Sequence, residues 1–116
     1  MKKIYHLSTC STCQRIIKEL QPGSDVVLQD IKTEPMTGEQ IDQMAEMAGS
    51  YEGLFSRRAM KHKSMGLKDK ELSEQDYRQL ILEEYTFLRR PVIIVNDNIF
   101  VGNAKKEVEG AKEALG

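Results

Sequence analysis

The two cysteines of the chain, Cys10 and Cys13, lie at the junction between two patterned segments. The residues before them, 2–6, are typical of a short strand. After them, apolar side chains recur at positions 13, 16, 17 and 20, which is the spacing of an amphipathic helix. Cys10 therefore falls where a strand turns into a helix. The unpaired N–H groups and partial positive charge of a helix N-terminus stabilise a thiolate there and lower its pKa.

A cysteine pair with this spacing and position is typical of thiol redox chemistry, although three other interpretations fit the residues. A structural disulfide would close a very short loop, which constrains the unfolded chain little. A zinc site would add His6 and His62 to the two cysteines, but the histidine spacing matches no common tetrahedral pattern. Two unreactive core thiols are the third alternative. The motif favours redox chemistry, in an enzyme or in a switch.

The size and charge of the chain exclude several classes of protein. A length of 116 residues suffices for one domain with a single core, and 40% apolar with 30% charged residues is typical of a soluble globular protein. The net charge of −1 argues against direct nucleic-acid binding. No apolar run is long enough for a membrane span, and we expect no signal peptide because residues 1–3 lead directly into a strand. We therefore expect a cytoplasmic protein, in which a cysteine pair is more often catalytic or sensing than structural.

The remaining strands predict an α/β fold. Residues 25–29 are typical of a buried strand, which completes a βαβ unit with parallel strands. Residues 92–95 and 99–101 predict a hairpin around an Asn-Asp-Asn turn. Gly102 and Asn103 are expected to cap a final helix.

Helices are predicted between these two groups of strands. They begin at Thr37 and at Ser73, each followed three residues later by a capping-box partner, and the first ends at Gly49. Residues 50–67 predict short helical turns. The order β-α-β, a helical insertion at about 37–88, then β-β-α is that of a thioredoxin-like fold. We expect one such domain over residues 1–116, with a mixed sheet flanked by helices.

Basic residues form two candidate anion-binding groups. Arg89 and Arg90 stand directly before Pro91. In a thioredoxin-like fold this X-Pro bond enters the hairpin beside the cysteine pair, commonly in the cis form, so an arginine here would bring a planar cation close to Cys10. A loop salt bridge is the alternative. The second group is a basic segment that is either a solvated face or a pocket for an oxyanion or an acidic thiol partner. Its members are Arg57, Arg58, Lys61, His62, Lys63, Lys68 and Lys70.

Two further side chains lie close to Cys10 in the sequence. The ring of His6, at the end of the first strand, would favour the thiolate if it approaches the sulfur, and a structurally paired histidine is the alternative. Thr12 would either donate a hydrogen bond to the sulfur or cap the helix.

Several motifs combine into a family pattern that runs from Ile4 to about Glu109. They are Ile4-Tyr5-His6-x-x-x-Cys10-x-Thr12, Asp30-Ile31-Lys32 followed by Pro35, the segment from Leu54 to Leu67 with Arg58 and Gly66-Leu67, Arg90-Pro91-Val92, and Val101-Gly102. In these motifs the chain resembles the arsenate reductase (ArsC) family, which also contains the redox-controlled transcription regulator Spx.

The resemblance implies a thiol-dependent oxidoreductase in which Cys10 attacks an oxyanion such as arsenate, or a disulfide. Cys13 would resolve the adduct, and Arg90 would be catalytic with the two cysteines. Glutathione with glutaredoxin, or thioredoxin, would restore the dithiol, with no bound cofactor and no metal. The residues implied in substrate binding are Arg57, Arg58, Arg90, Thr12, His6 and Pro91.

The chain also departs from the glutaredoxin-linked reductases it resembles. Those proteins commonly lack a cysteine at position 13, have an arginine near Gly102, and have Asn-Pro where this chain has Leu7-Ser8. The cysteine pair is more similar to that of Spx and other CxxC members. An Spx-like redox sensor that binds RNA polymerase is therefore the alternative function.

Overall fold

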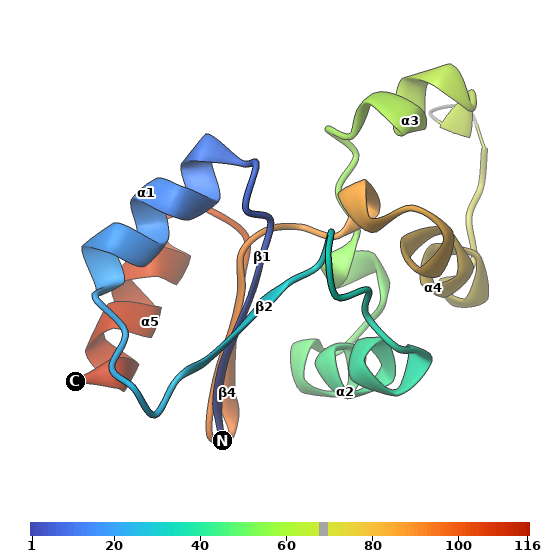
Figure 1. Cartoon of the computed structure of the whole chain (residues 1–116). Coiled ribbons are helices and arrows are strands. Elements are labelled where there is room, and N and C mark those ends of the chain that lie inside the picture. The colour runs from blue at the N-terminus through green and yellow to red at the C-terminus, as the bar shows by residue number, and fades with distance from the viewer. Residues whose placement is uncertain (68–69) are drawn as a thin grey trace. The chain divides into compact units, whose positions relative to one another are not determined.

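The computed structural model describes residues 1–67 and 70–116, so that Lys68 of the basic segment lies outside the described residues. The chain divides into two compact units, which we call unit 1 (residues 1–35 and 90–116) and unit 2 (residues 36–89). Figure 1 traces both. Unit 1 contains β1 (Lys2–His6), α1 (Ser11–Leu20), β2 (Val27–Asp30), β3 (Val92–Val95), β4 (Asn98–Val101) and α5 (Lys105–Leu115). Unit 2 contains α2 (Gly38–Ala48), η1 (Glu52–Leu54), α3 (Met60–Ser64), α4 (Glu74–Glu83) and η3 (Tyr85–Phe87).

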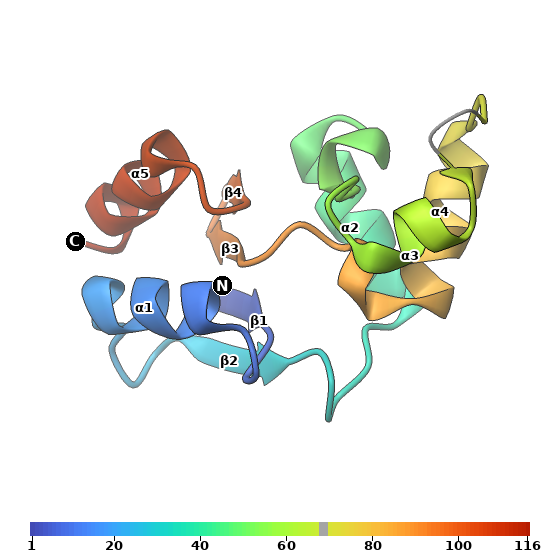
Figure 2. The same cartoon turned by 90° about the horizontal axis from the view of Figure 1, so that it is seen from above.

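Unit 1 is built on a mixed four-stranded sheet in the order β2-β1-β3-β4. The central strand β1 pairs in parallel with β2 and antiparallel with β3, and β3 pairs antiparallel with β4. Helices α1 and α5 lie side by side on one face of this sheet (Figures 1 and 2). The mixed sheet flanked by helices that the sequence predicted is therefore confirmed.

The core of unit 1 fills the space between this face of the sheet and the two helices. Its Ile16 belongs to the apolar stripe of α1 that also carries the buried Cys13. Burying such a side chain stabilises the fold by about 1.5–3 kcal/mol, so the stripe orients α1 on the sheet and with it the N-terminus of the helix at Cys10. The buried members of this core are Ile4, Ile16, Leu20, Ile93, Val95, Val108 and Ala111.

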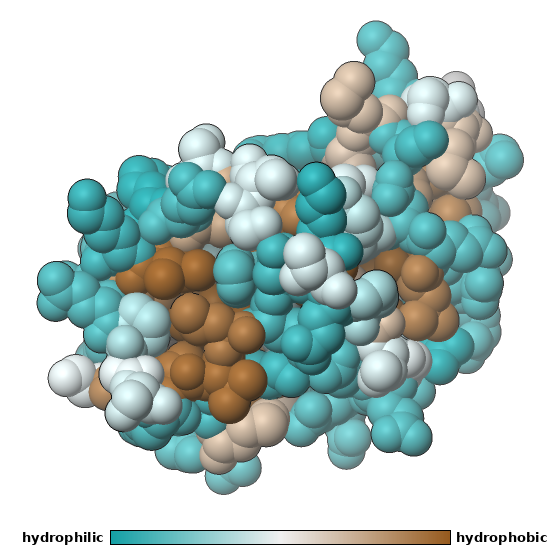
Figure 3. Space-filling model, viewed as in Figure 1, coloured by the Kyte–Doolittle hydropathy of each residue, from teal (hydrophilic) through white to brown (hydrophobic). Residues whose placement is uncertain are grey.

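Strand β2 differs from its prediction. It begins at Val27 instead of position 25, and Val27 and Leu28 are 56% and 46% exposed, so the prediction of a buried strand was wrong. The reason is topological, because β2 is an edge strand that pairs with β1 alone. Figure 3 shows hydrophobic surface over the region where Figure 1 places α1, α5 and β2.

Helix caps in unit 2 match the sequence pattern. Thr37 and Ser73 each form a complete capping box, and Gly49 ends α2 in the left-handed conformation with a φ of 97°. Both boxes satisfy backbone N–H groups that have no partner within the helix. Among the described residues, no helix is long and apolar enough to cross a membrane.

Acidic side chains tie the segments of unit 2 together. Asp42 of α2 accepts hydrogen bonds from the Tyr51 hydroxyl at 2.6 Å and from Arg78 Nε at 2.7 Å. The carboxylate of Glu74 accepts the backbone N–H groups of Tyr51 and Glu52. These contacts link α2, the turn before η1 and α4.

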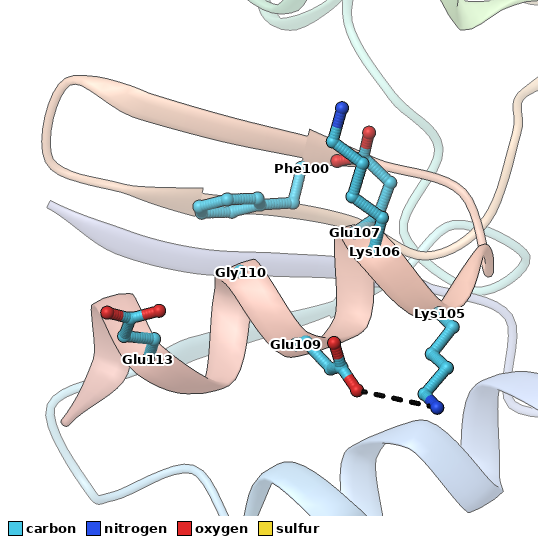
Figure 4. A pocket seen from close by; sticks show the side chains of 7 residues that line it. All are labelled: Phe100, Lys105, Lys106, Glu107, Glu109, Gly110 and Glu113. Atoms are coloured by element: carbon cyan, nitrogen blue, oxygen red, sulfur yellow. Dashed lines mark ion pairs between the residues drawn. The ribbon is translucent and has the colours of Figure 1, made fainter.

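A glycine in α5 makes room for an aromatic ring of β4. A Cβ atom added at Gly110 would lie 2.7 Å from Cε1 of Phe100, well inside normal contact distance. Figure 4 shows the ring beside the helix at this position. The two residues line a pocket together with Lys105, Lys106, Glu107, Glu109 and Glu113. Helix α5 itself begins after Ala104 as N-cap, without a side-chain cap, so the predicted cap at Gly102 and Asn103 was wrong in position.

We predict that Gly110→Ala destabilises the protein only while Phe100 is present. In a helix interior alanine is favoured over glycine by about 1 kcal/mol, whereas overpacking costs about 1–3 kcal/mol. Urea denaturation followed by circular dichroism should show that Gly110→Ala lowers the free energy of unfolding in the wild-type background and raises it in the Phe100→Ala background. If Gly110→Ala changes the free energy of unfolding in the same direction in both backgrounds, the Phe100 ring is not the reason that position 110 requires glycine.

Candidate active site around Cys10

A tight turn connects β1 to α1 and ends at Cys10. The Cys10 N–H donates to the Leu7 carbonyl at 2.9 Å, which closes the turn over Ser8 and Thr9. Cys10 is then the N-cap residue of α1, with an extended backbone. Its side chain therefore lies beside the N–H groups of the first helical turn, as the sequence pattern predicted.

The surroundings of Cys10 favour its thiolate. Partial burial raises the pKa of the thiol, but the backbone N–H of Cys13, the Cys13 thiol and the backbone N–H of Thr12 each stabilise the negative sulfur. The positive charge of Arg90 adds to them, and the net effect holds the pKa of Cys10 below its ordinary value. Hydrogen bonds to a charged acceptor at a helix N-terminus act in this direction.

The environment of Cys13 has the opposite effect. Its side chain is completely buried, and burial raises the pKa of this thiol to about 11. A backbone hydrogen bond with Leu7 opposes the rise, and the charge of Cys10 adds to it. Both cysteines are free thiols, and the Cys13 thiol donates to the Cys10 sulfur. Cys10 is thus a partly exposed nucleophile, and Cys13 is a protonated partner within hydrogen-bonding reach of it.

Arg90 and Pro91 approach the cysteine pair from the start of β3. The Arg90–Pro91 peptide bond is cis, as expected from the sequence. The carbonyl of Pro91 accepts the Gly102 N–H at 2.9 Å, which anchors this bond to the end of β4. The positive charge of the Arg90 guanidinium lowers the pKa of Cys10, and the same charge would offset negative charge that develops at this sulfur.

The two other predicted neighbours of Cys10 take different positions. Thr12 contributes its backbone N–H to the Cys10 sulfur, and the α1 cap uses no side-chain hydrogen bond. His6 pairs with Asp30 across β1 and β2. The pKa of that carboxyl is lowered mainly by the hydrogen bond from the Ser8 side chain, and His6 adds a smaller electrostatic contribution. The role of the His6 ring in substrate binding stays a prediction.

Asp30 binds the turn before Cys10, a role that the sequence pattern did not predict. Its carboxylate accepts the backbone N–H of Ser8, in the turn before Cys10. The signal was its place at the end of the second strand, because the carboxyl ends of adjacent parallel strands lie at the same edge of a sheet.

The basic segment belongs to unit 2, and its role at the Cys10 site stays a prediction. Arg57 is engaged within that unit, with hydrogen bonds to Glu52 at 3.0 Å and to the Tyr77 hydroxyl at 2.9 Å. In the part of the chain that the structure describes, the Arg58 side chain forms no ion pair. Arg89 also serves a local purpose, since its Nε donates to the Phe55 carbonyl at 3.1 Å.

No group of three or more histidine, cysteine or acidic side chains among residues 1–67 and 70–116 could hold a metal ion. The residues of the zinc alternative, Cys10, Cys13, His6 and His62, do not form such a group. His62 is instead a buried neighbour of Phe55, with ring centroids 6.0 Å apart.

The profile of the ArsC family matches residues 5–111. The chain belongs to the ArsC family. Among curated proteins, none matches the sequence. Solved structures are similar over nearly the whole chain. The arsenate reductase from Vibrio cholerae is 19% identical with a TM-score of 0.72, covering 97% of this chain and 96% of that one.

Two other solved structures are also similar in fold to this chain. An arsenate reductase (ArsC) related protein from Brucella melitensis is 23% identical, with a TM-score of 0.68 and coverage of 94% and 92% of the two chains. An ArsC family related protein from Bacteroides fragilis is 20% identical, with a TM-score of 0.79 and coverage of 95% and 96%. Likenesses at this identity establish the fold, which is the thioredoxin-like α/β fold predicted from the element order. Membership of the ArsC family supports a thiol-dependent reductase.

We predict that Cys10 reacts with iodoacetamide well before Cys13 at neutral pH. The thiolate is the reactive form, and the pKa of Cys10 is lowered while that of Cys13 is raised to about 11. Peptide mapping over a pH series should show Cys10 labelling rise with pH and level off before Cys13 labelling begins. Equal labelling, or a Cys10 midpoint at about 8.5, the ordinary value, would contradict this assignment. The Cys10→Ser variant is the control, and its Cys13 should remain slow.

We further predict that mild oxidation joins Cys10 and Cys13 in an intramolecular disulfide. The two sulfur atoms are already hydrogen-bonded, and positions three apart at a helix start are within disulfide reach. After diamide treatment, intact mass should show the monomer with two hydrogens lost, and Cys13→Ser should not show this loss. If the wild-type product consists of covalent dimers, Cys13 is not the resolving thiol.

Proposed function

We propose that this protein is a thiol-dependent oxidoreductase in which the Cys10 thiolate attacks an oxyanion of the arsenate type. The observation that supports this most is the set of groups around the Cys10 sulfur. Two backbone N–H groups, the Cys13 thiol and the Arg90 charge all stabilise negative charge at one partly exposed atom. Such a preorganised site favours both the thiolate and a bound anion. A disulfide substrate would use the same nucleophile.

In the first step, Cys10 and arsenate condense with loss of water. The Cys10 thiolate, dihydrogen arsenate and one proton give a Cys10–arsenic(V) adduct and water, so a sulfur–arsenic bond forms while an arsenic–oxygen bond breaks. Arg90 offsets the charge on the arsenate oxygens. Arg58 is a candidate for a second cation, because its side chain has no ion pair among the described residues, whereas Arg57 is bonded to Glu52. Pro91 and Thr12 would border the anion, Thr12 through its backbone N–H.

The second step resolves the adduct. The Cys13 sulfur attacks the Cys10 sulfur, the sulfur–arsenic bond breaks, and its electron pair reduces arsenic(V) to arsenic(III), which leaves as arsenite. The proton of Cys13 passes to the departing arsenite. The resulting Cys10–Cys13 disulfide is then reduced by two thiols, either glutathione with glutaredoxin or the dithiol of thioredoxin. We propose the cytoplasm as the compartment, since it supplies these donors.

A coupled assay tests the proposal. Arsenate-dependent oxidation of NADPH should appear with glutathione, glutaredoxin and glutathione reductase, or with thioredoxin and its reductase. The Cys10→Ser variant should show none. Absence of arsenate-dependent turnover in both systems would refute the oxyanion substrate and leave a disulfide substrate or a regulatory role.

We predict that Arg90→Ala lowers kcat/KM more than Arg57→Ala does. Losing a fixed cation aimed at developing negative charge costs on the order of 3 kcal/mol, or about a hundredfold in rate. Arg57 is held instead by Glu52 and Tyr77, so its loss affects unit 2 first. Arg90→Ala should also raise the pKa of Cys10, because the guanidinium lowers that pKa in the folded protein.

Circular dichroism of both arginine variants is the control for folding. If folded Arg90→Ala keeps wild-type activity and a wild-type Cys10 pKa, the arginine does not face the thiol. A loss of activity in Arg57→Ala alone would place the anion in the basic segment instead.

The Spx-like alternative uses the same thiol chemistry and differs in its partner. Binding of the purified protein to RNA polymerase, with and without diamide, would test it. Redox-dependent binding together with an inactive coupled assay would favour the regulator.

A further inference from the structure

The peptide groups of Ser8 are held from both sides by side chains distant from the turn itself. Ser8 is the first inner residue of the turn that the Cys10 N–H closes on the Leu7 carbonyl. A turn of this kind leaves its inner peptide groups without backbone partners. Here the N–H of Ser8 and its carbonyl each have a side-chain partner, and the two partners come from β2 and α1.

Asp30 provides the contact on the strand side. Its Oδ1 accepts the Ser8 N–H and the Lys32 N–H, both at 3.2 Å. The Ser8 hydroxyl also donates to this carboxylate, and this bond is the largest cause that lowers the pKa of Asp30. The backbone of Asp30 is fixed by pairing with His6, and the next N–H, that of Ile31, donates to the His6 carbonyl at 2.9 Å. The carboxylate is thus a fixed acceptor at the end of the sheet.

Gln14 provides the contact on the helix side. Its Nε2 donates to the Ser8 carbonyl, while its own N–H donates to the Cys10 carbonyl at 3.1 Å in the first turn of α1. The side chain therefore reaches back over the N-terminus of the helix. Together, Asp30 and Gln14 connect the turn to the sheet on one side and to the helix on the other.

We propose that Asp30 and Gln14 are positioning residues for the Cys10 thiolate. They hold the peptide groups of Ser8 in place, and the Cys10 sulfur thereby keeps its hydrogen bonds from the N–H groups of Thr12 and Cys13. The inference deepens the proposed function, since it concerns the same nucleophile. Both side chains act through Ser8, which Asp30 binds at its N–H and Gln14 binds at its carbonyl.

The physical basis is the steep dependence of hydrogen bonds on distance and angle. The thiolate of Cys10 depends on several short-range donors that oppose its partial burial. A small rotation of the turn would weaken all of these donors together, while the burial would remain. Ser8 supplies the N–H group for the bond to Asp30, and a proline at this position would lack it, so this bond depends on the residue at position 8.

The test measures Cys10 ionisation directly, by the rate of iodoacetamide labelling at Cys10 against pH in the full chain. Asp30→Ala should raise the midpoint of this labelling curve by about half to one pKa unit. At pH 7 this shift slows labelling about three- to tenfold. The plateau rate at high pH should be unchanged, because the thiolate remains accessible. Asp30→Asn keeps an oxygen acceptor for the Ser8 N–H and should restore labelling towards the wild-type rate.

Matched variants separate positioning from general destabilisation. Asp25→Ala removes an aspartate just before the same strand that is bonded to Lys2 at 3.1 Å, and it should leave the midpoint unchanged. Gln14→Ala removes an exposed side chain and should raise the midpoint in a protein that folds normally. Gln79→Ala, which removes an exposed glutamine bonded to Glu83, is its control.

Two outcomes would overturn the inference. The first is a midpoint of Cys10 labelling against pH that is the same in Asp30→Ala and in Asp25→Ala. The second is a midpoint that is the same in Gln14→Ala and in Gln79→Ala, and this comparison decides the matter if Asp30→Ala does not fold. Neither outcome depends on arsenate turnover. A protein without reductase activity would still give a clear result, so failure of the positioning inference and failure of the proposed function are distinguishable.

Discussion

Unit 1 depends on the hydrogen bonding of β1 along both of its edges. This strand pairs with β2 on one side and β3 on the other. Tyr5 has a partner in both neighbouring strands, and the last residue, His6, pairs with Asp30 of β2. The turn that ends at Cys10 begins at the next residue. Because α1 is packed against the same sheet through Ile16 and Leu20, both ends of this turn are anchored. The position of the nucleophile is a consequence of strand pairing and helix packing.

The same arrangement explains why two cysteines of one motif have opposite acid–base properties. Cys10 is the N-cap residue, where helix N–H groups converge, and Cys13 lies one turn further along on the face that packs into the core. Donors stabilise the charge on the first sulfur, and burial disfavours it on the second. The helical period therefore separates a nucleophile from a protonated partner while it keeps the two sulfur atoms together.

Local sequence patterns predicted most elements of the fold correctly. The capping boxes at Thr37 and Ser73 and the glycine end of α2 depend on side chains within a few residues, and all three are observed. The buried strand at 25–29 was a wrong prediction, because an apolar run does not reveal whether a strand will have one neighbour or two. The cap of α5 was misplaced by one residue or more, which is the usual uncertainty of a helix boundary.

By itself, the sequence determined the chemistry available at the site. The position of Cys10 before an amphipathic helix predicted a stabilised thiolate, and Arg90-Pro91 predicted a cation and a cis bond beside it. The N–H groups of Thr12 and Cys13 are local in the sequence, and only the tertiary structure decided which distant residues support the site. Asp30 reaches Ser8 because β2 pairs with β1, and Arg90 reaches the cysteines because β3 pairs with the other edge of β1. Helix position is encoded by neighbouring residues, whereas these contacts join residues more than twenty positions apart, and strand pairing alone brings them together.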